Sequence, residues 1–177
     1  MQSPCEGRLV RLRAREPEDE PLFFAWMNDS EVTEHIPARY PASHMFERDW
    51  LTSSAKPGYS VGGFAVEALA DSRLIGSCAL RATSPENRSA NLGIMLGDRT
   101  RWDGGYGTDT MRVLCRFGFD MMNLHRIELD VYAGNARARR VSERIGFKTE
   151  GCLRQAHYKY GRYIDVITMG LLKGELE

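Results

Sequence analysis

The sequence predicts one α/β domain, spanning residues 1–177, with a mixed and mostly antiparallel sheet of about seven strands and about four helices. Strand-like runs separated by short turns precede and follow a central segment in which a strand, a helix and a strand succeed one another. A strand-helix-strand unit makes its two strands parallel, whereas short turns make antiparallel hairpins. With 42% hydrophobic residues, a chain of this length has enough apolar side chains for a continuous core.

The first half of the chain predicts a strand, two helices and a three-stranded meander. Residues 9–13 alternate in character like a short strand, and Pro17 opens a helical stretch. A second short helix is expected over residues 45–51. The runs of the meander, with turn-forming residues between them, cover residues 60–68, 73–81 and 89–96.

The second half predicts a helix, a strand, a further helix and a final hairpin. A glycine-rich loop at residues 102–108 leads into a helix, and residues 126–132 alternate apolar and charged side chains like a strand with one buried face. Asn135 is expected to cap the next helix, and Gly146 to end it in the left-handed conformation that glycine tolerates. The two last strands are expected over residues 148–158 and 163–172.

Charge and composition argue against nucleic-acid, membrane and export functions. Basic and acidic side chains number 24 each, so the chain has no charge excess for nucleic acid or a membrane surface. No apolar run approaches the roughly 20 residues that cross a bilayer, and the amino terminus lacks the basic-then-apolar pattern of a signal peptide. We therefore expect a cytoplasmic protein.

Metal and disulfide chemistry are not expected. The four cysteines are far apart and form no CxxC pair, and no two of the four histidines have the spacing of zinc ligands. Cys78 and Cys115 stand in apolar surroundings and are interpreted as small core residues. Catalysis through a cysteine nucleophile or a metal is therefore not part of the expected chemistry.

The loop at residues 102–108 is the most informative segment for function. It stands between the strand that ends at Leu96 and the helix that follows. Such an arrangement leaves backbone N–H groups free to point at one spot, where the helix dipole favours negative charge, so the loop predicts an anion site and suggests phosphate. It matches neither the GxxxxGK[ST] nor the GxGxxG form. A nucleotide-binding regulatory domain stays an alternative, although the chain lacks a Walker lysine and a ribose-binding acid.

Several motifs in order along the chain carry a family resemblance. They are NRSANLGIMLGD, RWDGGYGT, NLHRIELDVYAGN, RVSERIGF, EGCLR and GRYIDVITMGLL. Together they resemble the GCN5-related N-acetyltransferase (GNAT) superfamily, and within it the RimJ/RimL-like branch of ribosomal-protein N-terminal acetyltransferases. The resemblance covers about the whole chain and is densest from Asn87 to Leu172. It implies the fold of that superfamily, in which two central parallel strands splay apart.

The resemblance implies acetyl-coenzyme A as the acetyl donor and no metal. Its pyrophosphate would be held by backbone N–H groups of the glycine loop, whose residues are Trp102, Asp103, Gly104, Gly105, Tyr106, Gly107 and Thr108, and Arg101 lies one place before the loop. The superfamily often has Gln or Arg where Trp102 stands, but aromatic residues there are typical of this branch. The pantetheine arm would bind the backbone of Ile94, Met95 and Leu96, with one N–H group facing the thioester carbonyl. Asn135 stands at the family position that reaches the pantetheine or the pyrophosphate region. Several arginines could serve the 3′-phosphate or be plain surface charges: Arg99, Arg101, Arg139, Arg140 and Arg144.

Two residues depart from the catalytic pattern of the branch. Asn91 stands where the branch commonly has Glu. That Glu is a candidate for removing the proton of the amine through a water molecule, whereas the amide of Asn91 cannot act as a base. Ser142 stands where Tyr commonly donates a proton to the leaving thiolate; it could still donate a hydrogen bond, or be only a small residue against the cofactor. A coenzyme A binding protein without catalysis is therefore a second alternative.

The loss of a base at Asn91 predicts an acceptor amine with a low pKa, or a base from elsewhere. An α-amine of pKa about 7.7 to 8.0 costs about 1 to 1.4 kcal/mol to deprotonate at pH 7, against about 4.6 kcal/mol for a lysine-like amine. Candidate bases elsewhere are Glu31, Glu34 and His35, in the segment that helps line the acceptor cleft in this family. An ordinary exposed helix face is the alternative for the two glutamates.

The expected reaction is direct attack of a primary amine on acetyl-coenzyme A in a ternary complex. The acceptor classes left open are a protein amino terminus, a polyamine, an aminosugar or antibiotic and a free amino acid, and other acyl groups are also open. His157 and Tyr158 could border the acceptor cleft or have structural roles. A homodimer is expected from the family and from tyrosines near the last strands, Tyr158, Tyr160 and Tyr163.

Overall fold

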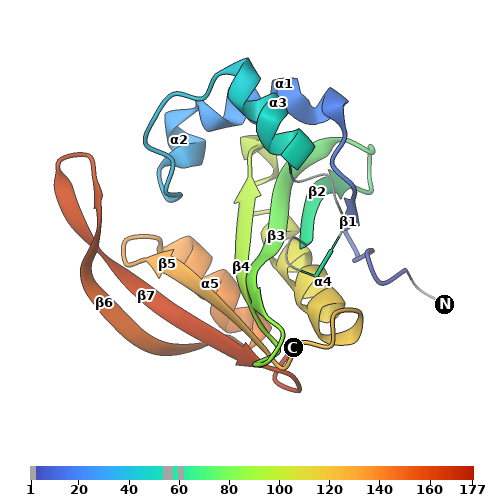
Figure 1. The fold of residues 1–177 in the computed structure, drawn as a ribbon, viewed down its shortest axis with the longest axis vertical. Coiled ribbons are helices and arrows are strands. Elements are labelled where there is room, and N and C mark those ends of the chain that lie inside the picture. The colour runs from blue at the N-terminus through green and yellow to red at the C-terminus, as the bar shows by residue number, and fades with distance from the viewer. Residues whose placement is uncertain (1–2, 54–57, 60–61) are drawn as a thin grey trace.

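Seven strands form one sheet in the computed structural model, which describes residues 3–53, 58–59 and 62–177 (Figure 1). The strands lie in the order β1-β2-β3-β4-β5-β7-β6. Their bounds are β1 Val10–Arg13, β2 Gly62–Ala68, β3 Leu74–Ser84, β4 Ser89–Leu96, β5 Arg126–Tyr132, β6 Lys148–Lys159 and β7 Arg162–Leu172. All neighbours are antiparallel except β4 and β5, which are parallel. The predicted mixed sheet is confirmed.

The described part of the chain contains five α-helices, against about four predicted from the sequence. They are α1 Glu20–Met27, α2 Ser30–Thr33, α3 His44–Ser53, α4 Tyr106–Asp120 and α5 Ala136–Ile145. The additional helix is α2, a single turn that is too short to show a periodic pattern. Asp29 caps it by accepting a hydrogen bond from the Glu31 amide at 2.9 Å.

The predicted boundaries agree closely with the observed ones. β4 and β5 begin and end at the predicted residues, and β1, β6 and β7 differ by one residue at one end. β3 continues to Ser84, through part of the expected turn. The stretch that begins at Pro17 is a 3₁₀ turn followed by α1. Residues 60–61 of the predicted second strand lie outside the described residues.

The main core lies between the sheet and the helices α4 and α5, which pack against each other. Ala90 and Leu92 of β4 point into it, as does the strongly apolar side of α4. Cys78 and Cys115 are buried in this core as expected, and burial raises the pKa of the Cys78 thiol to about 12. Both thiols are therefore protonated at neutral pH and act as small apolar groups.

A second apolar cluster lies on the other face of the sheet, under α1 and α3. It includes Phe23 and Trp26 of α1, and Met95 and Trp102 pack against its edge. Trp26 lies so close to Gly97 that a Cβ atom there would come within 1.9 Å of the indole ring. This cluster holds the three amino-terminal helices over the carboxyl end of β4, as Figure 1 shows.

The central parallel strands pair for only a short distance. The paired residues are Ser89 with Arg126, Ala90 with Ile127, and Asn91 with Glu128. Beyond these pairs, β4 continues to Leu96 against β3, and β5 continues to Tyr132 against β7. The two strands therefore splay apart, as predicted, and we call the region between their unpaired ends the β4/β5 gap.

Candidate functional site

The β4 edge of the gap exposes backbone groups of alternate residues. The Gly97 amide donates to the Ile75 carbonyl at 2.9 Å, and Met95 pairs with Ser77, so the backbone groups of these residues face β3. Since neighbouring residues of a strand face opposite ways, those of Ile94 and Leu96 face the gap. Of the three residues predicted to bind an extended ligand through their backbone, Met95 is thus the one whose groups are used within the sheet.

Trp102 closes the gap at the carboxyl end of β4. Its indole Nε1 donates to the Leu96 carbonyl at 2.9 Å, and the guanidinium of Arg137 lies 4.4 Å from the centre of its ring. Arg137 also lies 3.7 Å from the carboxylate of Asp103. The start of the glycine loop is therefore joined to the end of β4 and to the first turn of α5.

The glycine loop presents free backbone N–H groups at the start of α4. Asp103 and Gly105 adopt left-handed conformations with φ of 61° and 85°, and Gly105 is the N-cap residue. The Asp109 amide makes the first helical hydrogen bond, to Gly105. Within the described residues, the amides of residues 103–108 have no hydrogen-bond acceptor. Free amides at the positive end of a helix of this length form an anion site.

Arg101 is occupied inside the protein. Its guanidinium donates to the Tyr106 hydroxyl at 2.9 Å, and it forms ion pairs with Asp71 and with Asp98. It therefore holds the ring of Tyr106 in place at the start of α4, and the anion-binding capacity of the loop comes from its backbone.

The other predicted arginines divide into paired and exposed ones. Arg99 is paired with Glu31 at 2.5 Å, and Arg139 with Glu143 at 2.9 Å. Arg140 and Arg144 are exposed on α5. Arg144 lies seven residues after Arg137, about 10 Å further along the helix, so Arg137 is the α5 arginine that touches the loop. The sequence offered no signal for Arg137, because its contact partners are distant in the chain.

Asn135 caps α5, as predicted. Its Oδ1 accepts a hydrogen bond from the Ala138 amide at 3.0 Å, and its own amide donates to Tyr132 at the end of β5. Gly146 ends the helix with a φ of 112°. The two hydrogen bonds of Asn135, with Ala138 and with Tyr132, place the first turn of α5 beside the gap.

Ser142 is buried inside the helix packing. Its side chain is 1% exposed, and its Oγ donates to the Ala138 carbonyl at 3.0 Å. The hydroxyl proton is therefore used within α5. To donate to a ligand, Ser142 would first have to release this hydrogen bond.

Asn91 lies on the face of the sheet opposite α4, which we call the open face. It lines a cavity of about 210 Å³ together with three acids from neighbouring strands, Glu128, Asp130 and Glu150. Arg126 at the same cavity binds both Glu150 oxygens, at 2.7 and 2.5 Å. The alternation over residues 126–132 predicted one charged face, but not that this face meets Asn91 at the gap.

Glu34 lies at the other end of the gap from Asn91. The ion pair between Glu31 and Arg99 holds α2 beside the segment that follows β4, and β4 spans about 17 Å from Asn91 to Leu96. The Glu34 carboxylate is exposed and lies 3.9 Å from His35. The structure therefore places Glu34 on the rim of the site and does not bring it to Asn91.

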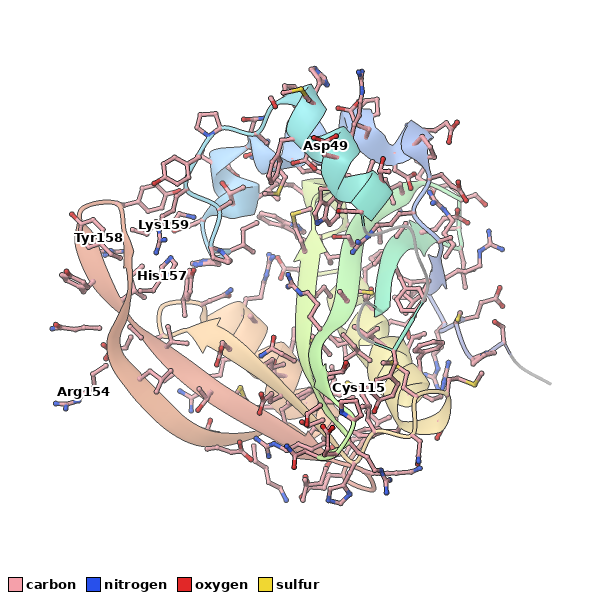
Figure 2. The ribbon with its side chains drawn as sticks, viewed as in Figure 1. Asp49, Cys115, Arg154, His157, Tyr158 and Lys159 are labelled. Atoms are coloured by element: carbon pink, nitrogen blue, oxygen red, sulfur yellow. The ribbon has the colours of Figure 1, made fainter. Side chains whose placement is uncertain are left out.

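The tip of the β6–β7 hairpin is fastened to this rim, where Figure 2 shows His157 and Lys159 beside the loop after α2. The side chain of Lys159 is buried, and its Nζ donates to the carbonyls of Thr33 at 2.5 Å and Ile36 at 2.9 Å. Arg39 donates through Nε to the Tyr158 carbonyl at 3.1 Å. The hairpin and α2 thus form a continuous wall on one side of the site.

His157 connects this wall to the end of β5. Its Nε2 lies 2.8 Å from the Tyr132 hydroxyl, and its Nδ1 lies 3.3 Å from Arg39 Nη2. Because a guanidinium can only donate, Nδ1 accepts and Nε2 carries the proton that is donated to Tyr132. Burial, with the charges of Arg39 and Lys159, lowers the pKa of His157, and burial raises the pKa of Tyr132. His157 is therefore neutral and Tyr132 protonated at neutral pH.

The arrangement has two chemically different halves. One half offers an anion cradle at residues 103–108 and free strand backbone at Ile94, a combination suited to an extended ligand with a phosphate group. The other half is an open face with unpaired and paired carboxylates beside Asn91. A ligand that enters through the gap would bring its far end to the carboxylates.

The described residues contain neither a metal site nor a membrane-spanning helix. Among them, no three His, Cys, Asp or Glu side chains are grouped as a metal site would require. No helix within the same residues has the length and apolar character needed to cross a membrane.

Comparison with known proteins covers most of the chain. Residues 9–148 match the family model described as "Acetyltransferase (GNAT) domain". An uncharacterized N-acetyltransferase p20 of Bacillus licheniformis is 29% identical over 168 residues, 94% of each chain. The putative ribosomal N-acetyltransferase YdaF of Bacillus subtilis (strain 168) is 30% identical over 142 residues, 79% of this chain and 76% of YdaF.

A solved structure has the same fold over nearly its whole length. The spermidine N-acetyltransferase of Vibrio cholerae, in complex with CoA and spermine, superposes with a TM-score of 0.86 at 25% identity. The match covers 94% of this chain and 96% of that one. The splayed sheet and its helices are therefore an arrangement that this chain shares with a solved protein.

Proposed function

Because the chain belongs to the acetyltransferase (GNAT) domain family, we propose that it transfers an acetyl group from acetyl-coenzyme A to a primary amine. The observation that carries the proposal is the combination of free amides at residues 103–108 with the β4/β5 gap. The first offers an anion site for the pyrophosphate, and the second an unpaired strand edge for the amide-containing pantetheine arm. Acetyl-coenzyme A carries both groups in one molecule.

On the donor side, we assign the pyrophosphate to the backbone of the glycine loop and the pantetheine arm to the backbone of Ile94 and the amide of Leu96. The Leu96 carbonyl already accepts the indole N–H of Trp102, so Trp102 serves as a wall of this channel. Asn135 and the first turn of α5 border it. The exposed Arg144 stays a proposed partner of the 3′-phosphate.

The proposed chemistry is direct attack of the neutral amine on the thioester carbonyl carbon. Asn91 lies at the inner end of the gap, where it can hold the amine or a water molecule by hydrogen bonds, and Ser142 is proposed to donate to the leaving sulfur after releasing Ala138. A thiol of pKa about 8.5 costs only about 2 kcal/mol to leave as thiolate at pH 7, so a weak donor is sufficient.

For the acceptor, we propose an α-amine of a peptide or a small amine of similarly low pKa. The exposed Glu34 on the rim supports a cationic acceptor, since it would attract an ammonium group before deprotonation. The relative YdaF is named a putative ribosomal N-acetyltransferase, which supports a RimJ/RimL-like peptide acceptor. The spermidine enzyme of Vibrio cholerae supports the second candidate, a polyamine.

A coenzyme A release assay tests the proposal. The panel contains amino-terminal peptides, polyamines, aminoglycosides and free amino acids, each with acetyl-coenzyme A at several pH values, and calorimetry measures acetyl-coenzyme A binding. We expect tight binding of acetyl-coenzyme A and release of the thiol with a low-pKa amine. Binding without turnover for every amine would instead support a non-catalytic coenzyme A binding protein.

Assembly and location stay separate proposals. Tyr158, Tyr160 and Tyr163 are exposed at the tip of the β6–β7 hairpin and support a homodimer through this tip. Sedimentation velocity of the protein and of Y160S/Y163S would measure it. A cytoplasmic location stays a prediction from the sequence.

A further inference from the structure

Asn91 lies in a row of residues that crosses the open face, and its two neighbours in the row carry opposite charges. On one side it pairs with Arg81 of β3, and on the other with Glu128 of β5. The uncharged amide of Asn91 therefore lies in the row between the cationic residue Arg81 and the acidic residue Glu128.

Two residues further along, β4 and β5 no longer pair, and Asp130 is the next acidic residue of β5 at the cavity. Extending the parallel register by two residues sets Gly93 of β4 across the gap from Asp130. Gly93 has no side chain, and the Arg81 guanidinium covers it so closely that a Cβ atom there would lie 2.2 Å from Nη2. The Arg81 guanidinium therefore covers β4 at the level where its backbone becomes free, and Asp130 lies on the β5 side of the gap.

Asp130 differs from the other acids of the cavity in having no cation bound to it. Glu128 lies 3.3 Å from Arg126, and Glu150 is bound to Arg126 through both oxygens. Among the described residues, no side chain or amide makes a hydrogen bond or ion pair with the Asp130 carboxylate. A carboxylate that is not neutralised keeps its full affinity for a proton or an ammonium group.

We propose that Asp130 accepts the proton of the acceptor amine, a role that the amide of Asn91 cannot perform. The inference rests on the proposed acetyl transfer and names its base. The ammonium group transfers one proton to the Asp130 carboxylate, and the neutral nitrogen attacks the thioester carbonyl carbon. As the C–N bond forms, the C–S bond breaks, and the second nitrogen proton leaves with the thiol. Asp130 then returns its proton to solvent.

The surroundings of Asp130 support this role. Partial burial and the negative charge of Glu128 raise the pKa of the Asp130 carboxyl, which makes its carboxylate a stronger base than that of an ordinary aspartate. The charged groups that line the same cavity are Glu128, Glu150 and Arg126, and Tyr132 follows two residues later on the same face of β5. The charge of Arg81 over Gly93 also disfavours an ammonium group at this point, so the amine is easier to deprotonate.

The test compares D130N with E128Q, a matched change in the neighbouring carboxylate that Arg126 already binds. Alanyl-alanine amide and spermidine serve as acceptors, and coenzyme A release is measured from pH 5 to 9. We expect D130N to lower kcat/KM by on the order of 100-fold and to abolish the rise in rate on the acid side of the profile. E128Q should lose less than about tenfold and keep that rise.

Two further variants make the result decisive. N91E in the D130N background places a carboxylate across the gap and should recover about tenfold of the lost activity. E34Q tests the rim glutamate as the base in the same assay. Acetyl-coenzyme A affinity and thermal stability should be the same in all variants, because none of the changes touches the donor channel.

The outcomes separate this inference from the proposed function. If the unmodified protein binds acetyl-coenzyme A but releases no thiol with any amine, the proposed function and its base both fail. If the unmodified protein is active and D130N stays within threefold of it, only the assignment of Asp130 is overturned. Loss of activity in E34Q with D130N unaffected would assign the base to the rim.

Discussion

The proposed donor side and the proposed acceptor side of this protein are built in different ways. The donor side, residues 94–108 with the first turn of α5, uses backbone groups whose positions follow from a strand, a turn and a helix in sequence. The acceptor side uses side chains from β3, β5 and the β6–β7 hairpin, together with the α2 segment. A site made of local backbone can be recognised in a sequence, whereas one made of distant side chains cannot.

The two sides also differ in how they are held. On the donor side, the left-handed Gly105 and the hydrogen bond from Trp102 to Leu96 set the loop within a short stretch of chain. On the acceptor side, Lys159 reaches across more than a hundred residues of sequence to the carbonyls of Thr33 and Ile36. We therefore expect changes on one side to leave binding on the other largely intact.

The largest effect is expected on the donor side, from Gly105→Val. A β-branched residue at a φ of 85° is strained and displaces the free amides, so acetyl-coenzyme A affinity should fall on the order of 100-fold. Calorimetry measures it. Gly134→Ala is the matched control, because a Cβ atom there meets open space. Equal affinities for the two variants would contradict the backbone cradle.

A smaller effect is expected on the acceptor side, from Lys159→Met. The change leaves the carbonyls of Thr33 and Ile36 without their charged donor, so the hairpin separates from α2 and the acceptor KM should rise about tenfold. Acetyl-coenzyme A affinity should stay within a factor of about two. An equal loss on both sides would show that the halves are coupled after all.

An intermediate effect is expected from two arginines of α5. Arg137→Gln removes the cation that stacks on Trp102, and acetyl-coenzyme A affinity should fall about fivefold. Arg144→Gln, on the same helix but two turns away, should lose less. The two dissociation constants decide between the arginine found in the structure and the one proposed from the sequence. A larger loss in Arg144→Gln would favour the sequence-based assignment.

The smallest effect is expected from pH at the hairpin. The pKa of His157 is lowered in the folded protein, so protonation is more favourable in the unfolded chain and stability is lost as the pH falls below about 6.5. Protonated Nδ1 can no longer accept from Arg39. His157→Gln should therefore reduce the decrease in Tm between pH 7 and pH 5 by about 1 °C. Parallel Tm curves for the two proteins would contradict this assignment.

Much of the fold was predictable because its elements have strong local periodicity. β5 alternates buried and exposed residues along its whole length, and the Asn135 and Gly146 caps stand at the positions that the residue types favour. The single-turn helix α2 was not predicted, since one turn has no period to detect. It is held by the Asp29 cap and by burial of Val32 in the second apolar cluster.

The candidate site was predictable in part. The glycine loop indicated an anion site from its residues alone, and its free amides are what the structure describes. The backbone of Met95 was predicted to face the ligand, but strand alternation directs it to β3 instead. Glu34 was considered as the base from its family position, whereas the fold holds it on the rim, away from Asn91.

By itself, the sequence determined the class of fold, the glycine loop before α4 and the family, because each depends on residues that are neighbours in the chain. Only the tertiary structure decided which charges meet at the gap. Strand pairing brings Asp130 to the same cavity as Asn91, and the β6–β7 hairpin brings Lys159 to α2. Such contacts depend on register and packing between distant segments, which local residue patterns do not encode.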